Sequence, residues 1–175
     1  MQRTRIVGET LAEAIHERGV ITIGAGMYDP GHAIRTDRSQ VGFKIGEHDG
    51  NVTERAERLA KLMCDVAPSK VTTNLWGERW SKLSVNCMAN GLAGLSGLGS
   101  AEVRTRDGVR RVAIHLAAET IKVGRARGHE VEPIWGITAS ASSTRQKGGR
   151  WPTWSATWRS GRRSWRAAGR RCSRT

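Results

Sequence analysis

The last 38 residues constrain the fold most, because they cannot build an ordinary hydrophobic core. Residues 138–175 contain no Leu, Ile, Val, Met, Phe or Tyr, and they hold ten basic residues and no acidic one. A packed interior needs branched aliphatic side chains that interdigitate. The folded part of this 175-residue chain must therefore lie in residues 1–137. We expect residues 138–175 to be a disordered basic tail.

The same segment explains the net charge of +13, which by itself would indicate a nucleic-acid or membrane-surface binder. The tail carries +10 of this charge and the remaining residues only +3. We therefore expect no nucleic-acid partner. A basic nucleic-acid-binding protein remains an alternative, because four tail tryptophans among arginines could stack on bases: Trp151, Trp154, Trp158 and Trp165.

The apolar runs predict neither a membrane span nor secretion. No run of about 18 apolar residues is present, which a membrane helix would need. The N-terminus reaches Glu9 before any signal-like apolar stretch. We expect a cytoplasmic protein without a membrane partner.

Periodicity and turn residues predict an α/β part followed by an all-α part. In the first part we expect helices over 9–18 and 53–66, strands over 19–24 and 40–46, and an extended piece over 70–73. In the second part we expect a helix that follows Asn74 as its N-cap, and another over about 109–127 before Gly128.

One glycine motif suggests a nucleotide site, but its spacing favours a turn. Gly24 and Gly26 fit G-x-G-x-x-G, whereas Asp29 takes the third glycine position and Pro30-Gly31 follow where a helix should begin. A strand leading into a turn is the better interpretation, so the cofactor-binding residues stay unassigned. The five histidines lack ligand spacing, and we expect no metal.

The helix after Asn74 carries the candidate chemistry. At 100° per residue, Asn86 lies about 40° and Asn90 about 80° from Lys82 around the axis. The rest of the circumference is almost all apolar, which predicts a buried helix whose polar groups need partners. Those partners could be an interhelical hydrogen-bond network or a ligand. Lysine offers a charge and a transferable proton, and asparagine offers a donor and an acceptor, which suit a small oxygen-rich substrate.

These residues carry a resemblance to a known family. The stretch WGERWSKLSVNCMANGLAGLSG (76–97) resembles the W-x-K-L-x-x-N-x-x-x-N-x-L signature of ketopantoate reductases (2-dehydropantoate 2-reductases). Upstream, GVITIGAGMYDPG and FKIGEHDG resemble the last strands of that family's nucleotide-binding domain. Downstream, AAETIKVGRARGHEVE (117–132) is similar to its E-x-x-x-V-x-x-x-x-G-x-x-V segment. The likeness covers about residues 6–137.

The resemblance implies a two-domain fold. Residues 1–73 would be the C-terminal part of an NADP-binding Rossmann-like domain, an α/β remnant that lacks the glycine-rich loop. Residues 74–137 would begin an all-α domain like the C-terminal domain of 6-phosphogluconate dehydrogenase. Residues 138–175 would be the tail. Family members dimerise through the helical domain, so the resemblance also implies a homodimer.

The resemblance further implies an oxidoreductase that uses NADPH to convert 2-dehydropantoate (ketopantoate) to pantoate in pantothenate and coenzyme A biosynthesis. Lys82 matches the catalytic lysine, which polarises and protonates the ketone oxygen. Asn86 and Asn90 match the amides that orient the keto-acid substrate. Glu119 matches a family acid, and a charge on the helix surface is an equal alternative.

The sequence also departs from the family pattern in several places. The family opens with a strand and G-x-G-x-x-G, and it has a late serine and glutamate pair, none of which this sequence matches. We therefore expect a truncated reductase, inactive alone, whose tail is an out-of-frame translation. The alternatives are a reductase of a related 2-keto acid and an inactive helical interaction module.

Overall fold

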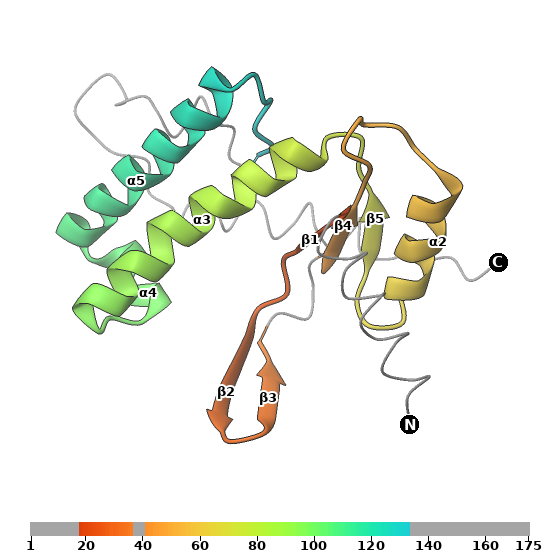
Figure 1. Ribbon diagram of the computed structural model, residues 1–175. Coiled ribbons are helices and arrows are strands. Elements are labelled where there is room, and N and C mark those ends of the chain that lie inside the picture. Colours follow the sequence, from red (N-terminus) through yellow and green to blue (C-terminus); the bar gives the residue numbers. More distant parts are fainter. Residues whose placement is uncertain (1–17, 37–40, 134–175) are drawn as a thin grey trace. The chain divides into compact units, whose positions relative to one another are not determined.

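The computed structural model describes residues 18–36 and 41–133 (Figure 1), and these fall into two compact units. The first unit ends at Leu75 and the second begins at Trp76. The helix expected over 9–18 and the tail lie outside the described residues, and the domain assignment stays a prediction. Among the described residues, no helix is both long and apolar enough to cross a membrane.

The first unit contains a mixed three-stranded sheet with the order β1 (Gly19–Ile21), β4 (Phe43–Ile45) and β5 (Ser69–Val71). Strand β4 pairs antiparallel with β1 and parallel with β5. The strands predicted over 19–24 and 40–46 are therefore present, although each is shorter than expected. This mixed pairing is compatible with the remnant of a larger α/β sheet.

Helix α2 (Glu54–Met63) packs on this sheet and completes the core of the first unit. Thr53 is its N-cap and accepts a hydrogen bond from the Ala56 N–H. The apolar face of the helix is buried, since Ala56, Ala60 and Met63 pack with Phe43 and Ile45 of β4. The predicted start of the helix is confirmed.

A separate two-stranded ribbon, β2 (Ala25–Asp29) and β3 (His32–Arg35), also belongs to this unit (Figure 1). Its turn lies at Pro30-Gly31, where Gly31 has a φ of 78° that favours glycine. The predicted turn is confirmed, whereas the strand pair was not predicted. Met27 and Tyr28 are exposed on it.

The second unit is helical. It consists of α3, α4 (Ser100–Thr105) and α5 (Asp107–Ala126), and α3 (Leu75–Ser96) starts at the last residue of the first unit. Helices α3 and α5 match the predicted pair, whereas α4 was not predicted. Met88 of α3 packs with Val103 of α4 and with Ala113 and Ala117 of α5. This cluster fixes one side of α3 against the other two helices.

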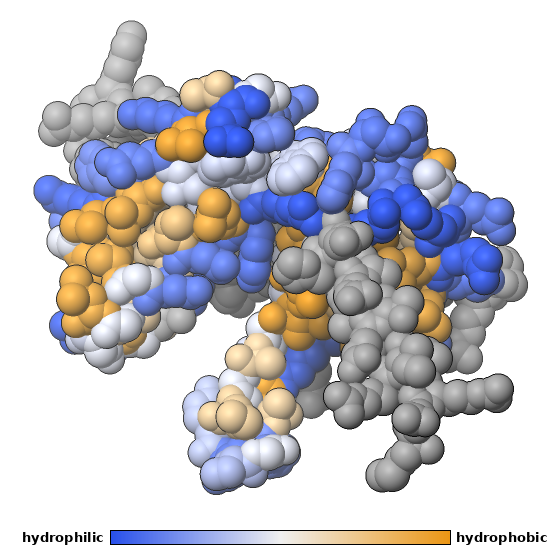
Figure 2. All heavy atoms as spheres, in the orientation of Figure 1, coloured by the Kyte–Doolittle hydropathy of each residue, from blue (hydrophilic) through white to orange (hydrophobic). Residues whose placement is uncertain are grey.

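The expectation that α3 is buried all round is wrong. Trp76 is 39% exposed, Leu83 44% and Leu95 87%, and Figure 2 shows hydrophobic surface over the helical unit. An apolar circumference does not require neighbours on every side of a helix. Within the unit, α4 and α5 pack on one side of α3, so part of its apolar surface stays accessible.

Candidate functional site

The three predicted site residues of α3 lie on one arc of the helix. Lys82 and Asn86 are half-buried and Asn90 is exposed. Successive members are four residues apart, which places their Cβ atoms about 6 Å from one another. One ammonium and two amides are thus presented side by side, on a rigid helix rather than a loop.

None of these three side chains forms a hydrogen bond or an ion pair within the described chain. The interhelical network considered from the sequence is therefore not formed among the described residues. The expectation that burial forces partners on all three is also wrong, because Asn90 is exposed and water can satisfy its amide. The arc remains available to a ligand.

The packing of the unit turns this arc away from α5. The α3 residues in contact with the shared core include Met88, Val85 and Leu92. At 100° per residue this set is centred roughly 90° from Lys82 and 130° from Asn86 around the helix axis. The polar groups therefore do not point into the helix–helix contact.

Glu119, the fourth predicted site residue, is not brought to this arc. It is exposed on α5, whose buried face carries Ala113, Ala117 and Ile121. Glu119 lies about half a turn away from that face, on the side opposite to α3. This placement favours the alternative of a charge on the helix surface.

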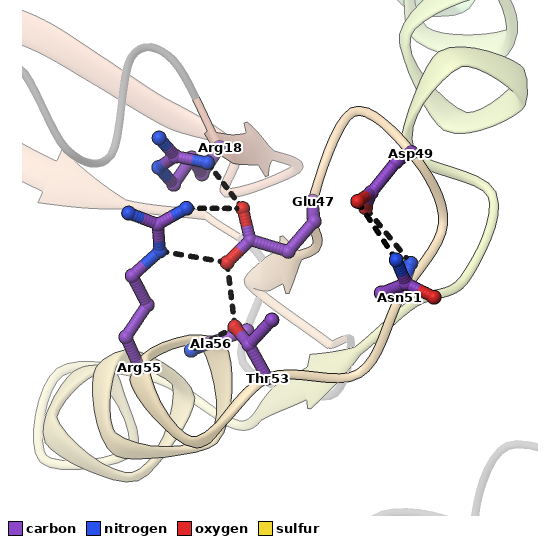
Figure 3. Close-up of polar contacts among 7 residues, drawn as sticks. All are labelled: Arg18, Glu47, Asp49, Asn51, Thr53, Arg55 and Ala56. Atoms are coloured by element: carbon purple, nitrogen blue, oxygen red, sulfur yellow. Dashed lines mark hydrogen bonds and ion pairs between the residues drawn. The ribbon is translucent and has the colours of Figure 1, made fainter.

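A second polar centre, which the sequence analysis did not single out, surrounds Glu47 in the first unit (Figure 3). Glu47 lies two residues after the end of β4 and is only 4% exposed. Its carboxylate accepts hydrogen bonds from Arg55 Nε at 2.8 Å and Nη2 at 2.9 Å, and from Thr53 Oγ1 at 2.5 Å. Arg18, just before β1, forms a further ion pair with it.

These contacts stabilise the ionised carboxylate. The hydrogen bonds from Arg55 and then Thr53, with the charges of Arg18 and Arg55, lower the pKa of Glu47 from 4.5 to about 2, although burial opposes them. The cluster joins the end of β4 to the N-terminus of α2 and to the start of β1. Its role is structural, because both oxygens of the Glu47 carboxylate already have hydrogen-bond partners.

The loop after Glu47 is held by its own side chains. Asp49 accepts the Asn51 backbone N–H at 3.0 Å and the Asn51 side-chain amide at 2.8 Å. The backbone bond first, and then the side-chain bond, lower the pKa of Asp49. Gly50 has a φ of 81°, and a Cβ there would lie 2.7 Å from the Thr73 carbonyl oxygen. The loop over 48–51 is thus a closely fitted turn.

A dinucleotide cofactor lacks its usual cradle among the described residues. That cradle is a strand, a glycine-rich turn and a helix whose N-terminus faces the pyrophosphate. Gly24 and Gly26 instead lead along β2 into the turn with β3, which confirms the turn interpretation. Tyr28 covers Gly26, where a Cβ would lie 3.0 Å from the tyrosine ring. Within the described ranges, no three His, Cys, Asp or Glu side chains gather as metal ligands.

The decisive comparison concerns the helical unit. Residues 74–150 match the family model described as ketopantoate reductase PanE/ApbA C-terminal. Over this segment, the chain is similar to the C-terminal domain of ketopantoate reductases. No curated protein matched the chain.

The match to the ketopantoate reductase C-terminal domain contains all of α4 and α5 and every predicted site residue. It also begins at Asn74, the residue where the helical domain was expected to start. The match continues to residue 150, beyond residue 137 where the quoted resemblance ended. The beginning of the expected out-of-frame tail is therefore covered by the family model.

Proposed function

We propose that α3 forms the substrate-binding wall of an NADPH-dependent 2-dehydropantoate 2-reductase, which converts ketopantoate to pantoate in pantothenate and coenzyme A biosynthesis. One observation carries the proposal. Inside the segment that matches the ketopantoate reductase family, Lys82, Asn86 and Asn90 lie on one arc of a rigid helix, and none has a partner in the described chain.

The chemistry of the arc suits carbonyl reduction. Reduction of a 2-keto acid adds a hydride to the carbonyl carbon and a proton to the oxygen. The ammonium of Lys82 can hydrogen-bond to the ketone oxygen, draw electron density toward it and donate the proton. Asn86 and Asn90 can each donate to a carbonyl or carboxylate oxygen and accept from a hydroxyl. Lys82 is thus the proposed general acid, and the asparagines orient the substrate.

The hydride donor implied by the family is NADPH, which supplies the two electrons of the reduction when bound. The described residues do not provide its pyrophosphate cradle, so no cofactor-binding residue is proposed in β1 to β3. The proposed substrate contacts rest on α3 alone. A related 2-keto acid that shares the carbonyl and carboxylate would use the same contacts.

Side-chain amide signals in NMR test this proposal without needing turnover. Ketopantoate added to the 175-residue chain should shift the amide signals of Asn86 and Asn90 in a saturable manner. Lys82→Met should weaken this binding at least about tenfold, because a charged hydrogen bond of roughly 1.5–3 kcal/mol is lost. Lys122→Met is the matched control, since Lys122 is exposed on α5.

The outcomes discriminate between substrates and between functions. Equal binding by the Lys82 and Lys122 variants would exclude Lys82 from the site. Tighter binding of 2-oxobutanoate than of ketopantoate would favour a reductase of a related keto acid. No shift with either acid would contradict a substrate wall on α3.

The exposed apolar residues of α3 favour one second candidate, a helical interaction module that pairs as a homodimer. Leu83 and Leu95 are large, exposed and on the helix that the family model covers. A surface of this kind often marks a protein interface. Sedimentation of the chain and of its Leu83→Glu/Leu95→Glu variant would test it: a dimer that dissociates in the variant supports the module, and a monomer in both excludes it.

A further inference from the structure

The contact between α3 and α5 is closest at Trp80 and Gly124. A Cβ atom on Gly124 would lie 2.9 Å from Cδ2, 3.0 Å from Cγ and 3.1 Å from Cε3 of the Trp80 indole. Carbon atoms in ordinary contact are about 3.5–4.0 Å apart. The indole therefore occupies the space that any larger residue at position 124 would need, and α5 is buried at this point.

The segment after α5 also contacts this indole. Gly128 has a φ of 83°, which lets the chain turn back at the end of the helix. The His129 N–H then donates to the Gly124 carbonyl oxygen at 3.1 Å, and the His129 ring lies 6.1 Å from that of Trp80. Val131 is buried with Ile121, and Trp80 packs against both.

This segment also fixes the first turn of α3. The rings of His129 and Trp76 stack with centroids 5.5 Å apart and an interplanar angle of 20°. The Glu132 N–H donates to the Gly77 carbonyl oxygen at 3.3 Å. Rotation of α3 about its own axis is therefore restrained by contacts on one side, two turns or less from Lys82.

Trp80 precedes Lys82 by two residues, so the two side chains leave α3 about 160° apart. Seating the indole on Gly124 therefore points Lys82 away from α5. A helix is stiff over two residues, and a shift of Trp80 must change the direction of the lysine as well.

We propose that Gly124 is a positioning residue for Lys82. Because Gly124 has no side chain, the Trp80 indole can pack directly on α5. This packing sets the direction in which the Lys82 side chain points. The proposal rests on the function assigned above to Lys82, but its first test does not require a substrate.

That test compares Gly124→Ala with Gly108→Ala in the 175-residue chain. Gly108 lies on the same helix and has no atom within 4 Å of a built Cβ, so it is the matched control. Each protein is labelled briefly with an acetylating reagent, and mass spectrometry gives the ratio of acetylated Lys82 to acetylated Lys122. We expect the ratio to change in Gly124→Ala and to equal the unaltered chain's ratio in Gly108→Ala.

A purely structural role gives a different result. It would lower the melting temperature of Gly124→Ala and leave the ratio in the folded protein unchanged, which would overturn the proposal. If Gly124→Ala does not fold, Trp80→Leu replaces it, because removing the indole releases the same contact. An unchanged ratio in that variant would equally overturn the proposal.

Ketopantoate binding separates this proposal from the proposed function. Gly124→Ala should weaken binding about tenfold, which is the loss expected when the charged hydrogen bond from Lys82 is no longer formed. The double variant Trp80→Leu/Gly124→Ala should lose no more than the single variants combined, because both substitutions remove the same contact. If the unaltered chain binds no keto acid while the acetylation ratio still responds, the proposed function fails and the positioning role stands.

Discussion

Glu47 and Arg55 form a two-pronged ion pair, with one guanidinium nitrogen on each carboxylate oxygen (Figure 3). The carboxylate is 4% exposed, whereas the Arg55 side chain is 64% exposed. The pair therefore has one buried and one solvated end. If the carboxylate is removed, water can still reach the Arg55 side chain. If the arginine is removed, the Glu47 carboxylate stays buried away from water.

Glu47→Gln should lower the free energy of unfolding by about 1–3 kcal/mol at neutral pH, because charged hydrogen bonds from Arg55 and Arg18 are lost. Urea unfolding followed by circular dichroism measures the change. Asp65→Asn is the control, since Asp65 is exposed after α2 and should change stability by less than about 0.5 kcal/mol. A loss of the same size in both variants would contradict a specific role for Glu47.

The same carboxylate predicts an acid dependence of stability. Its pKa is about 2 in the folded chain and 4.5 ordinarily, so the folded state favours the ionised form. Its contribution is complete above pH 4.5 and is lost as the pH falls from there through about 2. The stability difference between the unaltered chain and Glu47→Gln should therefore shrink across this interval. A difference that stays constant down to pH 2 would refute the assignment.

Thr53→Ala should cost about 1–2 kcal/mol, because Thr53 both caps α2 and donates to Glu47. Thr53→Ser keeps the hydroxyl and should recover most of that stability. Since Thr53 and Glu47 share a hydrogen bond, the double variant Thr53→Ala/Glu47→Gln should lose less than the two single losses combined. Strict additivity in chemical denaturation would indicate that the two residues act independently.

Gly46→Ala should be strongly destabilising, because a Cβ would lie 2.4 Å from the Thr72 carbonyl oxygen beyond β5. Gly91→Ala is the contrasting variant on α3, where no atom lies within 4 Å. It should instead stabilise the helix by about 0.5–1 kcal/mol, owing to the higher helix propensity of alanine. Thermal unfolding of both proteins measures the two opposite shifts.

The sequence predicted the elements whose signals are local. Thr53 marks the start of α2, and Asn74 marks the start of the long helix α3. The turn at Pro30-Gly31 was equally clear from residue type. Each of these depends on residues a few positions apart.

What the sequence did not reveal depends on contacts between distant residues. The Glu47 cluster needs β1 to pair with β4, since only this pairing brings Arg18 beside a carboxylate 29 residues later. The predicted burial of α3 failed for a related reason. Periodicity shows which faces of a helix are apolar, but not which of them find a neighbour, and Leu83 and Leu95 remain exposed.

The spacing of the arc on α3 also bears on substrate length. Lys82 and Asn90 are eight residues apart, which is about 12 Å along the helix axis. A three-carbon keto acid that hydrogen-bonds to Lys82 is too short to reach Asn90 unless both side chains bend toward each other. If all three side chains of the arc contact the substrate, as proposed above, we expect a longer acid with a polar group at its far end to bind more tightly than pyruvate.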